Sequence, residues 1–184
     1  MNPKDLEEKQ LSHKYIFKGR IINLRVDEAA LPNGRTATRE VIEHPGGVCV
    51  AALTEGEELY VVRQFRYPYG EVVLELPAGK REWGEAPEPC GRRELTEETG
   101  VTAENFRFLG ELYPSPGYVG EVIYLYLATG LTTGDMHPDE DEFLQVEKIP
   151  LARLVDMVLS GEIKDAKTQA LVMKVYALRQ RGEV

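Results

Sequence analysis

Apolar and polar side chains alternate along residues 13–44, around a turn signal, LPNG, at residues 31–34. A period of two between turn residues is typical of antiparallel strands. The pattern therefore predicts a small antiparallel β-sheet of about three strands at the start of the chain.

The pattern changes after HPGG at residues 44–47, where alternating strands give way to strands mixed with helices. Apolar positions at spacings of three and four, or tracts that end at a glycine, predict helices. The expected helices cover residues 85–99, 151–160 and 166–179, and the expected strands cover residues 48–53, 59–64, 72–76, 106–112, 122–128 and 143–148. This order predicts a mixed α/β or α+β sandwich at 46–184, preceded by the N-terminal sheet at 1–45.

Composition narrows the class of protein. The chain has 184 residues, 42% of them hydrophobic, and a formal net charge of −9. This length suits one domain with a small appendage and a substantial buried core. The negative charge disfavours nucleic acid and acidic membrane surfaces as partners. An anionic substrate can still bind if a divalent cation lies between the two negative charges.

Cysteine usage and the N-terminus bear on the compartment. The two cysteines, Cys49 and Cys90, form no C-x-x-C pair, and the charged start of the chain lacks the apolar region of a signal peptide. The longest uncharged apolar run is far too short to span a membrane. We therefore expect a cytoplasmic protein with no membrane association.

The candidate chemistry lies on the first predicted helix. Glu94, Glu97 and Glu98 occupy positions i, i+3 and i+4, so their carboxylates share one helix face. Such like charges destabilise a helix unless they are offset, and several oxygen ligands on one face suit Mg²⁺ or Mn²⁺. Arg93 lies four residues before Glu97 and can orient it. A solvated acidic helix face is the alternative.

The wider spacing favours a metal site. Residues 79–101 satisfy the pattern G-x5-E-x7-R-E-U-x-E-E-x-G-U, where U is aliphatic, with Gly79 as the first glycine. This segment resembles the Nudix box of the Nudix hydrolases. The resemblance implies a Nudix-type α/β/α sandwich with a mixed sheet, and Mg²⁺-dependent hydrolysis of a nucleoside diphosphate linked to another group, with Mn²⁺ as a possible substitute. It also implies that Glu94, Glu97, Glu98 and the backbone carbonyl of Ala78 hold the metal.

Further segments are similar to the ADP-ribose pyrophosphatase branch of that family. They are VVRQFRY at 61–67, ELPAG at 75–79, SPG at 115–117 and GEIKDAKT at 161–168. Pro116 follows Gly100 by sixteen residues, a spacing associated in that branch with ADP-ribose. The resemblance implies that the products are AMP and ribose 5-phosphate and that Pro116 and Gly117 contact the substrate.

The resemblance also implies that a glutamate in a late acidic loop deprotonates the attacking water. We assign this role to Glu142, directly before a predicted strand, and Glu140 is the alternative. Arg66 is the candidate for binding the diphosphate, because a guanidinium binds phosphate oxygens bidentately. Arg39 is a candidate for the nucleotide end, although strand arginines are often ordinary surface residues.

The N-terminal sheet has too few residues for a core of its own. By resemblance, two subunits exchange this sheet, which implies a homodimer whose sites draw on both copies. Tyr15 or Phe17 could then stack on the adenine. Two other functions stay open: the same chemistry on an ADP-sugar or GDP-hexose, and a non-catalytic ligand sensor. The number of metals and the phosphorus attacked also stay open.

Overall fold

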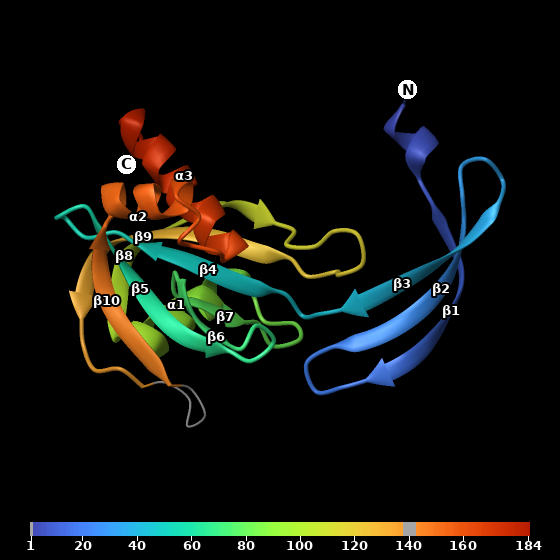
Figure 1. The fold of residues 1–184 in the computed structure, drawn as a ribbon, viewed down its shortest axis with the longest axis horizontal. Helices are drawn as coiled ribbons and strands as arrows, with labels where there is room; N and C mark the ends of the chain where they lie inside the picture. Colours follow the sequence, from blue (N-terminus) through green and yellow to red (C-terminus); the bar gives the residue numbers. More distant parts are fainter. Residues whose placement is uncertain (1, 138–142) are drawn as a thin grey trace. The chain divides into compact units, whose positions relative to one another are not determined.

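The computed structural model describes residues 2–137 and 143–184, and the chain forms two compact units (Figure 1). Unit 1 comprises Met1–Gly46 and Tyr113–Val122, and unit 2 comprises Gly47–Leu112 and Ile123–Val184. The N-terminal sheet was expected to end near residue 45, and the compact unit that contains it also takes in a second segment from the middle of the chain.

Unit 1 is built on an antiparallel sheet of three strands in the order β1-β2-β3. Its elements are the 3-10 helix η1 (Pro3–Leu6), β1 (Lys9–Lys18), β2 (Asn23–Ala30) and β3 (Thr36–Glu43). Gly34 has a φ of 81° in the turn between β2 and β3, a conformation that glycine adopts without strain. The three-stranded antiparallel sheet predicted from the alternating pattern is confirmed.

The second segment of unit 1 is joined to β3 through one residue. The backbone N–H of Ile42 donates to the carbonyl of Tyr118 at 2.8 Å, and the N–H of Gly120 donates to the carbonyl of Ile42 at 2.8 Å. These bonds attach the Pro-rich loop at 113–122 to the N-terminal sheet.

The described residues of unit 2 form two sheets. A mixed sheet has the order β7-β4-β9-β8, in which β4 and β9 are parallel and the other pairs are antiparallel, and an antiparallel sheet has the order β10-β5-β6. The strands are β4 (Gly47–Ala52), β5 (Glu58–Arg66), β6 (Glu71–Glu75), β7 (Ala78–Lys80), β8 (Val101–Leu112), β9 (Ile123–Thr133) and β10 (Leu144–Pro150).

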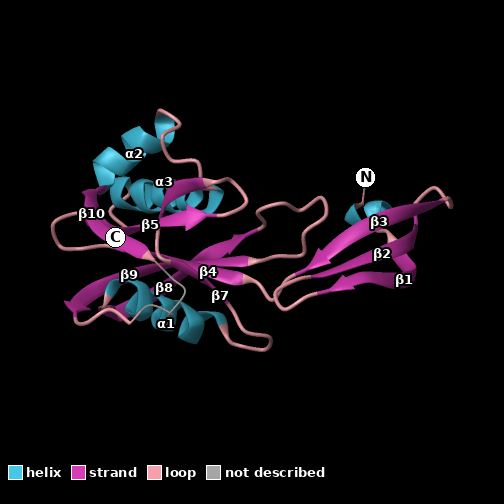
Figure 2. Ribbon diagram, turned by 60° about the horizontal axis from the view of Figure 1, so that its bottom comes forward, coloured by secondary structure: helices cyan, strands magenta, loops and turns pink. Residues whose placement is uncertain are grey.

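In the described part of unit 2, three helices cover the sheets: α1 (Pro87–Thr99), α2 (Leu151–Leu159) and α3 (Ala166–Gln180). Every residue of β4 is buried, because its successive side chains point into two different cores. Cys49 and Ala51 lie in the core that includes α2 and α3 side chains, whereas Val48 and Val50 lie in the core that includes α1 side chains. Figure 2 shows α1 on the opposite side of the sheets from α2 and α3. The predicted α/β/α sandwich is confirmed.

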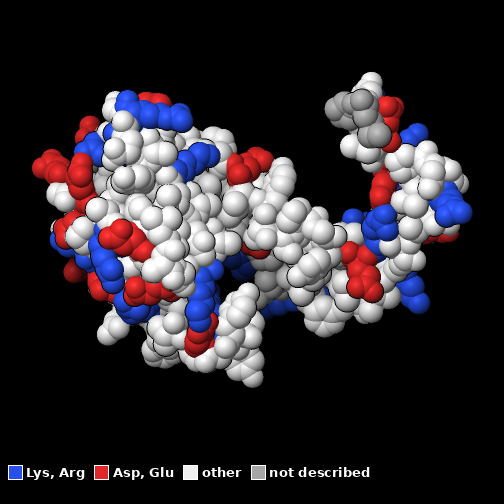
Figure 3. Space-filling view, turned by 45° about the horizontal axis from the view of Figure 1, so that its top comes forward, with Lys and Arg blue, Asp and Glu red and all other residues white. Residues whose placement is uncertain are grey.

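The three predicted helices and the predicted strands of unit 2 are present with modest shifts at their ends. β8 begins five residues earlier than expected, and β9 ends five residues later. These two extensions pair with each other, since the antiparallel ladder runs from Val101↔Thr133 to Leu112↔Ile123. β7 was not predicted, since it is only three residues long and includes a glycine. Basic and acidic side chains are interspersed on the face of unit 2 seen in Figure 3. No helix in the described part of the chain is long and apolar enough to cross a membrane.

Candidate active site

The candidate site is built on the short strand β7 and the helix α1. Pro87 occupies the first turn of α1, where its missing N–H costs nothing, and Gly100 ends the helix in the left-handed conformation with a φ of 70°. The N–H of Gly100 donates to the carbonyl of Thr96 at 2.8 Å. These end signals place the predicted glutamates in the second half of a regular helix.

Two of the predicted metal ligands are buried against β7. Glu94 is 9% exposed and Glu98 is 2% exposed. The N–H of Ala78 donates to Oε2 of Glu98 at 3.0 Å. A Cβ atom added at Gly79 would fall well inside van der Waals contact with the carboxyl group of Glu94. Only glycine therefore allows β7 to approach this helix face so closely.

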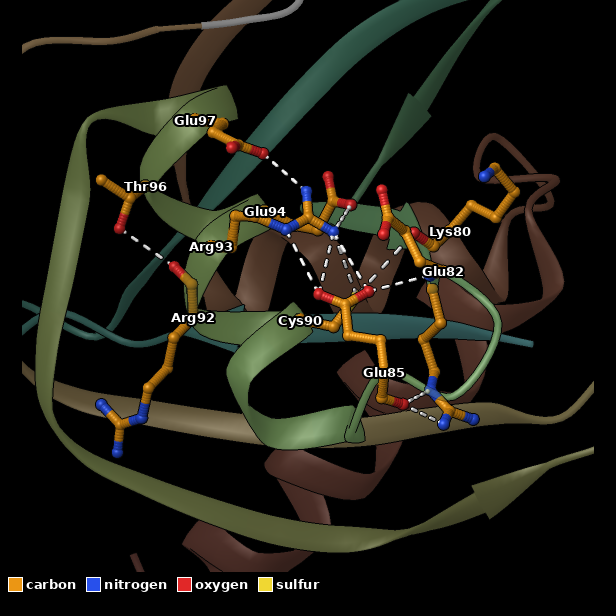
Figure 4. Close-up of polar contacts among 10 residues, drawn as sticks. Lys80, Glu82, Glu85, Cys90, Arg92, Arg93, Glu94, Thr96 and Glu97 are labelled. Carbon is orange, nitrogen blue, oxygen red and sulfur yellow. Dashed lines mark hydrogen bonds and ion pairs between the residues drawn. The ribbon is translucent and has the colours of Figure 1, made fainter. Parts of the chain in front are cut away.

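Arg93 lies beside three carboxylates (Figure 4). Its Nη1 donates to Oε2 of Glu97 at 2.8 Å, its Nη2 lies 2.9 Å from Oε1 of Glu94, and its Nε and Nη2 lie 3.4 Å from Oε1 of Glu85. Burial lowers the pKa of Arg93, but Glu94 and the hydrogen bonds to Glu85 and Glu97 outweigh burial and raise it. The predicted contact between Arg93 and Glu97 is present, and the same guanidinium also serves the two other carboxylates.

Glu85 supports this arrangement from the loop before α1. Its carboxylate accepts a hydrogen bond from the backbone N–H of Glu82 at 2.9 Å, in addition to its contact with Arg93. Burial raises the pKa of Glu85, but these two donors outweigh burial and lower it. Glu85 is therefore negatively charged at neutral pH and stabilises the position of Arg93.

The structure brings the three helix glutamates together only in part. Glu94 and Glu98 face β7, and Arg93 contacts the carboxylates of Glu94 and Glu97. Within residues 2–137 and 143–184, no three acidic, histidine or cysteine side chains form a ready-made metal cluster. Buried carboxylates one helix turn apart nevertheless fit a hard divalent cation, because such a cation would offset both their desolvation and their mutual repulsion. Ligation by Glu94, Glu97, Glu98 and the Ala78 carbonyl stays a prediction.

The predicted general base cannot be placed. Glu142 and the alternative, Glu140, lie outside the described residues, so the acid–base part of the site stays a prediction from the sequence.

Arg66, the predicted diphosphate ligand, lies in an ion-pair cluster that the sequence did not indicate. Its Nε and Nη2 donate to the two carboxylate oxygens of Glu75 at 2.5 and 2.7 Å. Lys167 also pairs with Glu75, and its Nζ lies 3.0 Å from Oδ1 of Asp165. Glu75 lies three residues before Ala78, whose N–H donates to Glu98, so one short segment connects this cluster to the buried carboxylates described above.

Two weak sequence signals mark the new members of the cluster. Glu75 is a charged residue within the apolar run VVLEL, and Lys167 is a basic residue in the first turn of α3, where the helix dipole favours acidic residues. Glu75 is 1% exposed, and the Lys167 side chain is 13% exposed. A charged residue is rarely buried without a partner, and here each is the partner of the other.

The remaining predicted substrate residues lie together in unit 1. Arg39, Pro116 and Gly117 line one hollow of about 300 Å³, together with Asp27, Tyr118 and neighbouring residues. Arg39 is held by Glu8, with 2.7 Å between Nη2 and Oε1.

The two aromatic residues considered for adenine stacking differ in their surroundings. The Tyr15 hydroxyl lies 3.2 Å from the Glu43 carboxylate, whereas Phe17 is 55% exposed. Which of them stacks on a base stays open.

Comparison with known proteins gives the family. Residues 43–171 match the NUDIX domain model, and residues 8–42 match the model of the nucleoside diphosphate sugar hydrolase N-terminal domain. An ADP-ribose pyrophosphatase of Bacillus subtilis is 42% identical over 167 residues, which cover 90% of each chain. A methanol dehydrogenase activator of Bacillus methanolicus is 40% identical over 88% of this chain and 89% of its own length.

A solved structure supports the fold. The crystal structure of an ADP compounds hydrolase superposes with a TM-score of 0.83 over 97% of this chain and 98% of that chain, at 22% identity. The NUDIX match spans more than half of the chain and contains both β7 and α1 with their buried carboxylates. The chain therefore belongs to the Nudix family and is a Nudix hydrolase whose N-terminal segment is that of the nucleoside diphosphate sugar hydrolases.

Proposed function

We propose that this hydrolase cleaves the pyrophosphate bond of ADP-ribose to give AMP and ribose 5-phosphate. The observation that carries the proposal is the pair of buried carboxylates, Glu94 and Glu98, that α1 holds against β7. The 42% identical ADP-ribose pyrophosphatase supports ADP-ribose as the particular sugar nucleotide.

Glu94, Glu97, Glu98 and the carbonyl of Ala78 would hold the divalent cation, which we propose to be Mg²⁺ with Mn²⁺ as a substitute. When bound, the cation neutralises charge on the diphosphate and lowers the pKa of a coordinated water. Arg93 would hold Glu97 in orientation, because its Nη1 already donates to that carboxylate. These carboxylates give an acidic protein a place where a diphosphate can bind together with its cation.

Glu142 would accept the proton of the attacking water. A general base within hydrogen-bond reach contributes about 10²- to 10⁴-fold to the rate. The supporting observation is the position of Glu142 in the sequence, two residues before β10 begins at Leu144. Glu140 is the alternative in the same acidic loop.

Four residues are candidates for binding the substrate. Arg66 would bind the diphosphate, Arg39 would bind the nucleotide end, and Pro116 and Gly117 would contact the ribose. The hollow shared by Arg39, Pro116 and Gly117 supports a common role for these three residues.

We also propose that the protein is a homodimer. Among the described residues of unit 1, Ala29 is the only buried apolar side chain, whereas Leu11, Ile16 and Phe17 on β1 are each more than half exposed. A sheet with so little core needs another surface to cover it, and a second copy of the chain would provide one. Light scattering after gel filtration should give about twice the 20.7 kDa chain mass.

The function is tested by Mg²⁺-dependent hydrolysis of ADP-ribose, ADP-glucose, GDP-mannose and NADH, with identification of the products. Preferred cleavage of ADP-ribose is expected. Preference for ADP-glucose or GDP-mannose would instead support the alternative of another nucleoside diphosphate sugar. Binding without turnover of any of them would support a ligand sensor. The same reaction in ¹⁸O-water identifies the phosphorus that is attacked.

A further inference from the structure

Glu75 is a buried carboxylate that two cations from different parts of unit 2 neutralise. It ends β6 and is 1% exposed. Arg66 of β5 binds both of its oxygens, and Lys167 of α3 binds Oε2. Burial raises the pKa of Glu75, but Arg66 and Lys167 together outweigh burial and lower it. Glu75 is therefore ionised at neutral pH.

The orientation of Arg66 depends on this carboxylate. Its Nε and Nη2 donate to Glu75, and no hydrogen bond of Nη1 is present among the residues that the structure describes. The Arg66 side chain is 37% exposed. The bidentate pair thus fixes the plane of the guanidinium and leaves one amino group for an anionic ligand.

Lys167 is itself held rigidly. Asp165 caps α3 by accepting the N–H of Thr168 at 2.9 Å, and its other oxygen lies 3.0 Å from Lys167 Nζ. The Thr168 hydroxyl accepts the N–H of Leu76 at 2.9 Å. The first turn of α3 therefore holds both Glu75 and the following residue of the segment that leads to β7.

Lys167 also sets the net charge of the cluster. Glu75 and Asp165 are negative, and Arg66 and Lys167 are positive, so the four side chains sum to zero. Loss of the Lys167 charge would leave a net charge of −1 beside the arginine, where it would repel an approaching diphosphate and pull the guanidinium more strongly toward Glu75.

We propose that Lys167 is a positioning residue for substrate binding. Through its ion pair with Glu75, it keeps the Arg66 guanidinium in the orientation that binds the diphosphate. Its positive charge also balances the negative charges of Glu75 and Asp165, which would otherwise repel the diphosphate. This inference rests on the proposed function. It assigns to the first turn of α3 a role in binding the substrate, through a residue that does not touch it.

The test compares Lys167→Met and Lys167→Gln with Lys167→Arg. The neutral variants should raise KM for ADP-ribose about tenfold with kcat little changed. The reason is that Arg66 would bind the diphosphate equally in the ground state and in the transition state, so weaker binding affects both states alike. Lys167→Arg should restore most of the affinity. Lys164→Met is the matched control, because Lys164 pairs with Glu71 on the surface, where the two side chains are 66% and 41% exposed.

A second readout does not require turnover. Calorimetric titration in the presence of Mg²⁺ with the methylene analogue of ADP-ribose, whose bridging carbon replaces the pyrophosphate oxygen and prevents cleavage, should show the same weakening of Kd for the neutral variants. An unchanged KM and Kd in folded Lys167→Met or Lys167→Gln, as judged by circular dichroism, would overturn the proposal. If the wild type cleaves none of the sugar nucleotides, the proposed function itself fails, which is a different outcome.

Asp165→Asn keeps the proposal testable if the neutral Lys167 variants do not fold. Asparagine can still cap α3 through its amide oxygen, and Lys167 keeps its ion pair with Glu75, while the net charge of the cluster rises by one. KM for ADP-ribose should then fall about threefold. An unchanged or higher KM would contradict the role of Lys167 in neutralising this cluster.

Discussion

The backbone of Gly79 lies directly against the carboxyl group of Glu94, with no room for a methyl group between them. Gly79→Ala should therefore displace either β7 or the Glu94 side chain. We expect a loss of about 1–3 kcal/mol in the free energy of unfolding, as for other overpacked sites, and a larger than tenfold loss of activity. Urea denaturation and initial rates measure the two effects.

Gly56→Ala is the matched control for this substitution. A Cβ atom there would lie 3.7 Å from its nearest neighbour, Thr54 Oγ1, which is ordinary contact. Stability and activity should stay close to wild type. Equal losses in the two variants would show that the contact between Gly79 and Glu94 has no special importance.

Replacement of Glu98 by glutamine tests the metal site. The amide oxygen of Gln can still accept the N–H of Ala78, so the fold should persist, while the ligand charge is lost. We expect kcat to fall at least about 100-fold, the upper end of the loss that follows removal of a metal's outer-shell partner. Glu88→Gln, a control on the exposed face of α1, should leave kcat unchanged. Unchanged kcat at saturating Mg²⁺ would refute the assignment.

Arg93→Met would leave Glu85, Glu94 and Glu97 without their common cation. The Arg93 side chain is 38% exposed, so solvent screens these pairs, and we expect a loss of about 1–2 kcal/mol in the free energy of unfolding. Mg²⁺ should raise the melting temperature of the variant more than that of the wild type, because it would offset the same carboxylates. Arg153→Met removes an exposed ion pair with Glu162. It should change neither the free energy of unfolding nor the effect of Mg²⁺ on the melting temperature.

The ionisation of Glu75 predicts a dependence of stability on pH. Its pKa is lowered in the folded state from an ordinary value of 4.5. The stabilisation from its ion pairs is therefore fully present above pH 4.5 and is lost as the pH falls through the lowered folded-state value. Glu75→Gln should be less stable than the wild type at pH 7, and the difference should shrink below pH 4.5. Urea midpoints from pH 7 to pH 3 measure this, and a constant difference would contradict it.

Glu142→Gln tests the general base. The variant should lose about 10²- to 10⁴-fold in kcat while its affinity for Mg²⁺ stays unchanged, because a base acts on the water and not on the cation. Mg²⁺ titration and steady-state rates separate the two quantities. If Glu140→Gln shows this behaviour and Glu142→Gln does not, the base is Glu140.

Periodicity and end signals predicted most of the fold. The alternating strands of unit 1 and the helix that ends at Gly100 were predicted because their patterns are local. Strand β7 was missed, since three residues cannot show a period. Its existence depends on pairing with β4, which is distant in the sequence.

The candidate site was predicted where its residues are close in the sequence. The contact between Arg93 and Glu97 follows from a spacing of four along one helix. Lys167 and Glu75 are 92 residues apart, so no local pattern reveals that they pair. Only the packing of α3 beside the end of β6 brings these two charges together.

The make-up of unit 1 has a consequence for exchanging parts between relatives. The chain crosses between the units after Gly46, after Leu112 and after Val122, and the middle segment is bonded to β3 at Ile42. A chimera that imports only a foreign N-terminal sheet would place that sheet against a loop selected for another partner. The sheet and residues 113–122 must therefore be inherited, or grafted, as a pair.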